Sequence, residues 1–173
     1  LEHLGTPYQG LLFPGLMVTA NGPRVLEFNA RFGDPETQVF MKLLDMDLLD
    51  LLLASTDNGF ARLGKVKWKP GYAVCVILAS GGYPGPCEKG KLITGINLAE
   101  QVPGVTVFHA GTKKGADGQF YNSGGRVLGI TSYAETLEIA IKRAYRAAGF
   151  INFDGMHYRR DIGQSLLKQA QVA

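Results

Sequence analysis

The most informative segment of the chain is Val25-Leu26-Glu27-Phe28-Asn29-Ala30-Arg31-Phe32-Gly33-Asp34-Pro35-Glu36-Thr37. Alternate side chains of an extended strand lie on one face, so Leu26 and Phe28 point to the same side. Glu27, Asn29 and Arg31 point to the other side and present a carboxylate, an amide and a guanidinium. Hard oxygen ligands suit magnesium, and a guanidinium suits a phosphate or a carboxylate. This face therefore predicts a metal site next to an anion; an ordinary half-solvated strand is the alternative that the spacing leaves open.

The second half of the segment is typical of a helix start. Asp34 suits the N-cap, and Pro35 suits the first helical position, where its missing amide hydrogen has no partner to lose. Glu36 then lies in the first turn, where a negative charge favours the helix dipole. Because helix N-termini also bind anions, a strand with metal ligands runs directly into a second place for ligand binding.

The residues before this segment predict its partner strand. Residues 10–19 are apolar on both faces, and Asn21-Gly22-Pro23 is a turn signal. Two strands joined so tightly form an antiparallel hairpin, with Glu27 and Asn29 on its second arm. The first arm, residues 11–20, contains no acidic residue. The hairpin is thus expected to offer a metal only the ligands on its second arm.

Composition excludes several function classes. Of 173 residues, 46% are hydrophobic and 19% charged, which is ordinary for a globular protein. The net charge of +3 is small and the basic residues are scattered, so no nucleic-acid partner is expected. No run approaches the roughly 18 apolar residues of a membrane span, and no signal peptide is recognisable. Cys75 and Cys87 lack metal or disulfide spacing, which favours a reducing, cytoplasmic location.

Helical periodicity continues after the opening segment. Val39, Phe40, Leu43 and Leu44 recur at helical spacing, and Asp47 is predicted to cap a second, leucine-rich helix that stops at Asn58-Gly59. That leucine stripe is read as core packing, with a partner-binding surface as the alternative. Lys65, Lys67 and Lys69 are expected to lie on a solvent-exposed strand edge, where their charges prevent pairing with another chain.

The character of the sequence changes between residues 58 and 70, which predicts a domain boundary there. Residues 1–60 form one domain and 61–173 the other. Strands are predicted at 72–79, 91–96, 105–109, near 120–121 and at 127–130. A capping box at Ser132-Tyr133-Ala134-Glu135 predicts a helix that ends at Gly149. The expected fold class is α+β, with a mainly antiparallel sheet in the second domain.

Other motifs indicate no separate chemistry. The loop Ser80-Gly81-Gly82-Tyr83-Pro84-Gly85 lacks the lysine and serine or threonine of a phosphate loop and is read as a structural turn. His3, His109 and His157 form no HxH or HxxxH pair, so no zinc site is expected. His109 ends a strand; a satisfied structural histidine and a residue approaching an active site are both open.

A known family resembles this chain in several separate motifs. The glycinamide ribonucleotide synthetases (phosphoribosylamine–glycine ligases) of the ATP-grasp superfamily carry a signature similar to Glu27-Phe28-Asn29 followed by Arg31-Phe32-Gly33-Asp34-Pro35-Glu36. The remaining similar motifs are Gly81-Gly82-Tyr83-Pro84-Gly85, Val107-Phe108-His109-Ala110-Gly111-Thr112, Gly124-Gly125-Arg126-Val127-Leu128, and Tyr158-Arg159 with Asp161-Ile162-Gly163. They occur in the family's order, so the resemblance spans nearly the whole chain.

The resemblance implies a fold and an activity. Residues 1–60 would be the C-terminal segment of an ATP-grasp domain, followed by a small α+β domain. Such enzymes phosphorylate the carboxylate of glycine with ATP, and 5-phosphoribosylamine then displaces phosphate to give glycinamide ribonucleotide in purine biosynthesis. Glu27 and Asn29 would bind Mg²⁺ or Mn²⁺, and Arg31 would stabilise the charge of the transferred phosphoryl group. Asp34 and Glu36 could contact glycine or the ribosylamine; helix capping and the helix dipole are their structural alternatives.

The family's N-terminal domain and ATP lid would precede Leu1, so the chain is expected to be a C-terminal fragment, inactive alone. Gly124-Gly125-Arg126 could close the site or be a structural turn.

Two other functions remain open. One is a different ATP-grasp carboxylate–amine ligase of purine synthesis, against which Asp34-Pro35-Glu36 argues. The other is a noncatalytic assembly domain that keeps the strand only as architecture.

Overall fold

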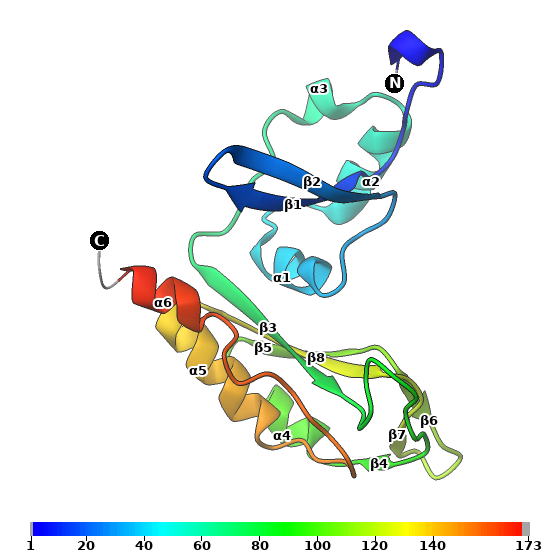
Figure 1. Ribbon diagram of the computed structural model, residues 1–173, viewed down its shortest axis with the longest axis vertical. Coiled ribbons are helices and arrows are strands. Elements are labelled where there is room, and N and C mark those ends of the chain that lie inside the picture. Colours follow the sequence, from blue (N-terminus) through cyan, green and yellow to red (C-terminus); the bar gives the residue numbers. More distant parts are fainter. Residues whose placement is uncertain (1, 171–173) are drawn as a thin grey trace. The chain divides into compact units, whose positions relative to one another are not determined.

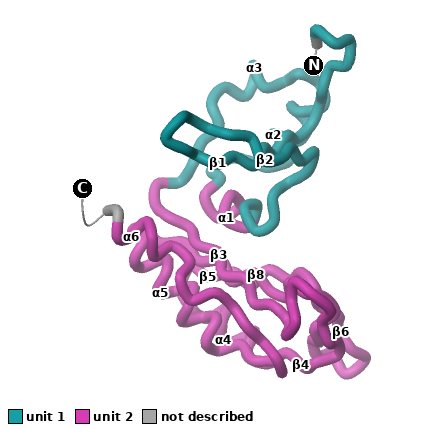
Figure 2. Tube along the Cα trace, in the orientation of Figure 1, with its two compact units in different colours: residues 1–37, 44–69 teal, residues 38–43, 70–173 magenta. Residues whose placement is uncertain are grey.

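The computed structural model describes residues 2–170, which form two compact units (Figures 1 and 2). The first unit comprises residues 2–37 and 44–69, and the second comprises residues 38–43 and 70–170. Figure 2 colours the first unit teal and the second magenta. Helix and mainly antiparallel sheet occur together, which confirms the predicted α+β class.

The first unit is built on the predicted hairpin. After a short 3-10 turn at Glu2–Leu4, β1 (Phe13–Thr19) pairs antiparallel with β2 (Gly22–Asn29). The Thr19 hydroxyl donates a 2.7 Å hydrogen bond to the Gly22 carbonyl and accepts one from the Asn21 amide, which closes the turn. The pairing register shifts between Gly15 and Leu16. The hairpin and its turn are thus confirmed.

Three helices follow the hairpin. α1 (Glu36–Leu43) begins at Glu36, so Pro35 lies just before the helix rather than in its first position as predicted. The Thr37 amide donates a 3.2 Å hydrogen bond to the Gly33 carbonyl, so the turn before α1 is hydrogen-bonded to the first turn of the helix. α2 (Leu48–Thr56) is capped by Asp47, whose carboxylate accepts the Leu49 amide at 2.8 Å, as predicted. α3 (Phe60–Leu63) is a single turn.

The lysine-flanked segment after α3 is not a strand. Within it only Trp68 forms a bridge, and its partner is Leu44. The Asp45 amide also bonds to the Lys67 carbonyl at 3.0 Å. The prediction of a strand edge guarded by lysines was therefore wrong; the pairing does not extend past Leu44 because the preceding residues belong to helix α1 (Glu36–Leu43).

The second unit contains the main sheet. Its strands are β3 (Tyr72–Ala79), β8 (Arg126–Ala134) and β5 (Val105–His109), in the order β3-β8-β5 and all antiparallel. β8 is central, and Leu128 and Ile130 on it are fully buried. α5 (Leu137–Ala148) covers one face of the sheet, as Figure 1 shows, and its alanines are buried. Residues 38–43 of α1 also belong to this unit, where the Lys42 ammonium donates a 3.0 Å bond to the Thr106 hydroxyl.

A smaller sheet and two short helices complete the second unit. β4 (Leu92–Ile93), β7 (Phe120–Asn122) and β6 (Thr112–Lys114) pair in the order β4-β7-β6. The strand predicted over 91–96 is shorter, because Ile96 begins α4 (Ile96–Glu100). α6 (Gln164–Ala170) was not predicted.

The predicted capping box was also wrong. Ser132 lies inside β8, and its hydroxyl donates to the Ala140 carbonyl of α5. The helix is instead capped by Thr136, whose hydroxyl oxygen accepts the Ile139 amide at 3.3 Å. Gly149 does end the helix, as predicted. Cys75 and Cys87 are free thiols, and none of the helices between residues 2 and 170 has the length and apolarity to cross a bilayer.

Candidate functional site

The two predicted metal ligands lie side by side on one face of the hairpin. The amide nitrogen of Asn29 donates a 3.0 Å hydrogen bond to Glu27 Oε1, which is possible because both residues belong to the same side of β2. Gly15 is the pairing partner of Glu27 across the hairpin. A Cβ atom on Gly15 would lie 3.1 Å from Glu27 Cγ. Because Gly15 has no side chain, β1 leaves room at this position for the side chain of Glu27.

The donor set of this face fits a hard divalent cation. Glu27 offers a carboxylate, and Asn29 offers an amide oxygen, because its hydrogen bond to Glu27 uses the amide nitrogen. No cluster of three His, Cys, Asp or Glu residues that could hold a metal occurs in the described chain. Magnesium usually takes only one or two carboxylates and completes its shell with water and substrate phosphates. The pair thus suits a cation that is shared with a phosphorylated ligand.

Arg31 lies just beyond the end of β2. One of its terminal nitrogens donates a 2.9 Å bond to the Phe32 carbonyl, and the side chain is otherwise exposed. A guanidinium has five N–H donors, so this bond leaves capacity for a phosphate or a carboxylate. The alternating pattern of the sequence predicted Arg31 as the third polar residue on the face of Glu27 and Asn29. In the structure β2 ends at Asn29, two residues before Arg31.

Glu36 is held at the other end of the same segment. A Cβ atom on buried Gly33 would overlap the Glu36 carboxylate and approach the Phe13 ring at 3.0 Å. Phe13 pairs with Asn29 across the hairpin, so Glu36 lies at the Asn29 end of β2. Asp34 is exposed in the turn before α1. The structure therefore brings Glu27 and Asn29 into direct contact and places the Glu36 carboxylate against Gly33.

Sequence reasoning missed Phe13 and Gly15. Both lie on β1 opposite the ligands, and Gly15 adjoins the register shift. A glycine inside a strand often marks close approach of another group, so Gly15 could have been singled out. Phe13 carried no such signal, because an aromatic residue in an apolar strand is ordinary.

His109 has structural partners in the second unit. Its Nδ1 lies 2.9 Å from the Thr112 hydroxyl, and its ring packs against Phe120 with centroids 4.4 Å apart. These contacts fix the ring at the end of β5 and account for the histidine without a ligand.

Two family profiles match the chain. The profile described as "Phosphoribosylglycinamide synthetase, C domain" matches residues 73–165, which is more than half of the chain. The profile described as "Phosphoribosylglycinamide synthetase, ATP-grasp (A) domain" matches residues 1–37. The hairpin and the second unit thus match parts of one family, in the same order.

Curated relatives agree with the profiles. The chain is 49% identical over 164 residues to the phosphoribosylamine–glycine ligase of Nostoc sp., which covers 94% of this chain and 38% of the relative. It is 45% identical to the chloroplastic phosphoribosylamine–glycine ligase of Arabidopsis thaliana, covering 98% of this chain and 32% of the relative. The chain therefore spans roughly a third of the length of the relatives it matches.

Solved structures are similar as well. The phosphoribosylamine–glycine ligase of Thermotoga maritima superposes with a TM-score of 0.78 at 38% identity, covering 92% of this chain and 38% of that one. The N5-carboxyaminoimidazole ribonucleotide synthetase of the same organism gives a TM-score of 0.60 at 18% identity, covering 84% of this chain and 37% of that one. The second likeness concerns the fold alone.

Proposed function

Because this chain belongs to the phosphoribosylglycinamide synthetase family, we propose that it is part of an enzyme that ligates glycine to 5-phosphoribosylamine. The products are glycinamide ribonucleotide, ADP and phosphate, in purine biosynthesis in the cytoplasm. Glycine is first activated as glycyl phosphate, which the amine of 5-phosphoribosylamine attacks. The relatives that match over nearly the whole chain carry the name of this ligase, which supports the assignment.

The hairpin face of β2 supplies the chemistry of this proposal. Glu27 and Asn29 hold a magnesium ion, or manganese, with their neighbouring carboxylate and amide oxygens. When bound, that ion neutralises the terminal phosphates of ATP and orients the phosphoryl group. The contact between Glu27 and Asn29 is the observation that carries the proposal, because it shows that the two side chains lie within hydrogen-bond distance on one side of β2.

Arg31, Asp34 and Glu36 have proposed roles around that pair. Arg31 stabilises the negative charge that accumulates between ATP and the glycine carboxylate, since its N–H groups beyond the bond to Phe32 can donate to it. Asp34 and Glu36 bind the ammonium of glycine or the amine of the ribosylamine through their carboxylates. Their positions before and at the start of α1 support this role.

The proposed enzyme needs more than these residues. The hairpin exposes large apolar side chains, with Val18 84%, Leu26 65% and Phe28 64% exposed. A two-stranded hairpin is marginally stable alone, and such a surface normally packs against something. We assign residues 1–60 to an ATP-grasp domain whose remainder, in the other two thirds of the relatives' length, covers this surface. The 173 residues alone are then expected to have negligible ligase activity.

Two measurements test the proposal. In a full-length ligase that carries this sequence, ADP release should depend on glycine and not on formate or bicarbonate, which other carboxylate–amine ligases would accept. Glu27→Gln and Asn29→Ala should each reduce that release strongly, whereas the matched change Glu135→Gln, on an exposed carboxylate of the second unit, should not. Full ADP release in both site variants would favour a noncatalytic role for the strand.

A further inference from the structure

A cavity opens in the second unit between the end of α5 and the segment that follows it. Its volume is about 480 Å³, a size typical of small-molecule sites. Ala148, the last residue of α5, and Ile151 are the buried part of its lining, at 0% and 2% exposed. Met156 and Tyr158, both half-buried, also line it. The cavity therefore offers apolar surface against which part of a ligand can pack.

Main-chain bridges fix two of the residues that line this cavity. Asn152 pairs with Thr94 through hydrogen bonds of 2.9 and 3.1 Å. His157 pairs in the same way with Ala79 at the end of β3, through two bonds of 2.9 Å. Because the backbone is fixed at both positions, the cavity exists before a ligand binds, and binding does not have to order the segment.

Arg160 is the one positively charged side chain among the residues that line the cavity in the described chain. Its guanidinium lies over the Tyr158 ring, 5.1 Å from the ring centroid, which is a cation–π distance. The Tyr158 ring in turn lies 6.3 Å, centroid to centroid, from the ring of Tyr145 on α5. Within residues 2–170 the Arg160 guanidinium has no carboxylate or other hydrogen-bond acceptor as a partner. Its five N–H donors are therefore available to a ligand.

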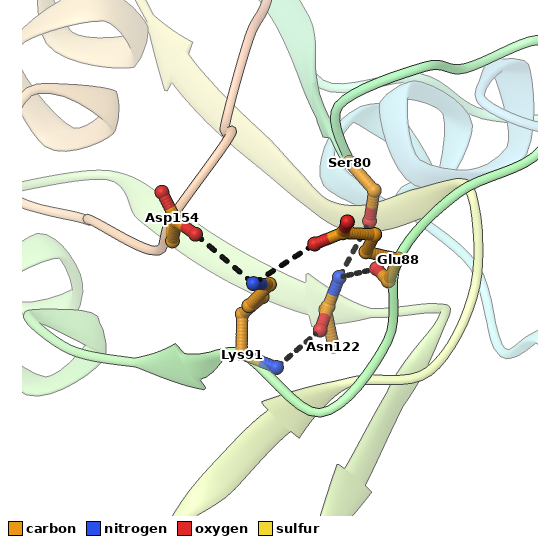
Figure 3. A network of polar contacts seen from close by, with 5 residues as sticks. All are labelled: Ser80, Glu88, Lys91, Asn122 and Asp154. Atoms are coloured by element: carbon orange, nitrogen blue, oxygen red, sulfur yellow. Dashed lines mark hydrogen bonds and ion pairs between the residues drawn. The ribbon is translucent and has the colours of Figure 1, made fainter.

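The acidic residues nearest to Arg160 in sequence are already paired. The Asp154 carboxylate lies 3.1 Å from the Lys91 ammonium, as Figure 3 shows. The Asp161 carboxylate is bound by Arg159 at 2.7 Å. The lining of the cavity, within the part of the chain that the structure describes, includes no aspartate or glutamate. The positive charge of Arg160 is thus uncompensated at the cavity, which favours an anionic ligand.

The carboxyl end of α5 also borders the cavity, and a helix dipole is negative at that end. Its carbonyl groups have partners. The Tyr145 carbonyl accepts the Gly149 amide at 3.0 Å, and the Ala148 carbonyl accepts the Ile151 amide at 3.2 Å. These bonds reduce the negative charge that the helix end presents to a ligand.

We propose that this cavity binds an organic anion in which a carboxylate or a phosphate is attached to a planar ring. The Arg160 guanidinium binds the oxyanion in the bidentate manner typical of arginine, and the His157 imidazole adds a further polar contact. The ring packs against Met156 and Tyr158, because thioether and aromatic side chains both make favourable contacts with rings. The Asn152 amide can donate to and accept from polar groups at the ring edge. The site uses none of the residues of the proposed ligase reaction and is independent of that function.

Ligand titration of the 173-residue chain, without ATP, metal or glycine, tests the site. Phenyl phosphate and benzoate are the two ring anions, inorganic phosphate is the probe without a ring, and benzyl alcohol is the probe without a charge. By NMR, at least one ring anion should shift the Met156 methyl signal and the His157 ring signals, and the one that binds more tightly identifies the oxyanion. Inorganic phosphate should bind more weakly, and benzyl alcohol should leave these signals unchanged. No shift with either ring anion, or equal affinity for either control probe, would overturn the proposal.

Variants separate recognition from folding. Arg160→Ala should weaken binding of the tighter ring anion about tenfold or more, because it removes hydrogen bonds between charged groups. Arg160→Lys should weaken it less, because lysine keeps the charge but not the bidentate fork. Arg24→Ala, which removes an exposed arginine of β2, is the matched control and should leave the affinity unchanged. Because Arg160 is exposed, the melting temperatures of its variants should stay close to that of the parent. Unchanged affinity in both Arg160 variants would refute the assignment whether or not the ligase activity is established.

Discussion

Replacing Gly15 by alanine tests whether the Glu27 side chain lies across the hairpin as a metal ligand. The new methyl group would lie 3.1 Å from Glu27 Cγ, closer than the optimal 3.5–4.0 Å or so between carbon atoms. The Glu27 side chain must therefore give way by a few tenths of an ångström, which a change in its χ angles provides. A rotation of about 30° off its rotamer costs about 0.5–1.5 kcal/mol, which corresponds to a two- to tenfold or so loss in affinity.

The assay is the KM for magnesium-ATP of a full-length ligase that carries this sequence. We expect Gly15→Ala to raise this KM about two- to tenfold. Its melting temperature should change little, because alanine also restricts the unfolded chain. Gly149→Ala is the matched control, since a Cβ atom there meets only ordinary contacts, the nearest at 3.4 Å. An unchanged KM with Gly15→Ala would refute the argument that Glu27 crosses this glycine to reach the metal.

Two further predictions concern the fold and its pH dependence. Asp47→Ala removes the cap of α2 and should lower the free energy of unfolding by about 1 kcal/mol in urea denaturation; Asp50→Ala, in the same first turn, should have a smaller effect. The Arg159 hydrogen bond lowers the pKa of Asp161, so this pair stabilises the fold above the unfolded pKa of the carboxyl, and the stabilisation is lost as pH falls through the lowered folded pKa. Melting temperatures between about pH 2 and 6 should fall less steeply for Asp161→Asn than for the parent; equal slopes would contradict this.

Local patterns in the sequence predicted the parts of the fold that depend on neighbouring residues. The alternation around Glu27 and the Asn21-Gly22-Pro23 turn specified the hairpin. The Asp47 cap and the strand Val105–His109 were also predicted correctly, because both depend on a few adjacent side chains. The pairing of Glu27 with Asn29 followed from period-two alternation alone.

The errors arose where tertiary contacts or backbone conformation overrode local pattern. Ser132 has the spacing of a capping box, but β8 continues through it because both neighbouring strands pair with it. The strand predicted over 91–96 stops early because Gly95 adopts a left-handed φ of 83°, which turns the chain into α4.

The sequence predicted the polar residues of β2 at the candidate site but not the residues of β1 opposite them. The position of Gly15 opposite Glu27 depends on a register shift that leaves Leu26 of β2 unpaired, which no alternation pattern reveals. The cavity after α5 depends on the bridges that join Asn152 to Thr94 and His157 to Ala79, and the residues of each pair are far apart in sequence. Such non-local pairing is fixed by the packed sheet and not by adjacent residues.

The most direct test of the central claim is calorimetric binding of magnesium with a non-hydrolysable ATP analogue to a full-length ligase carrying this sequence. The combined variant Glu27→Ala, Asn29→Ala should lose the magnesium-dependent part of the nucleotide affinity, because both oxygen donors of the hairpin face are removed. The control Glu135→Ala should retain it. Equal magnesium-dependent affinity in the combined variant and the parent would contradict the assignment of this hairpin as the metal site.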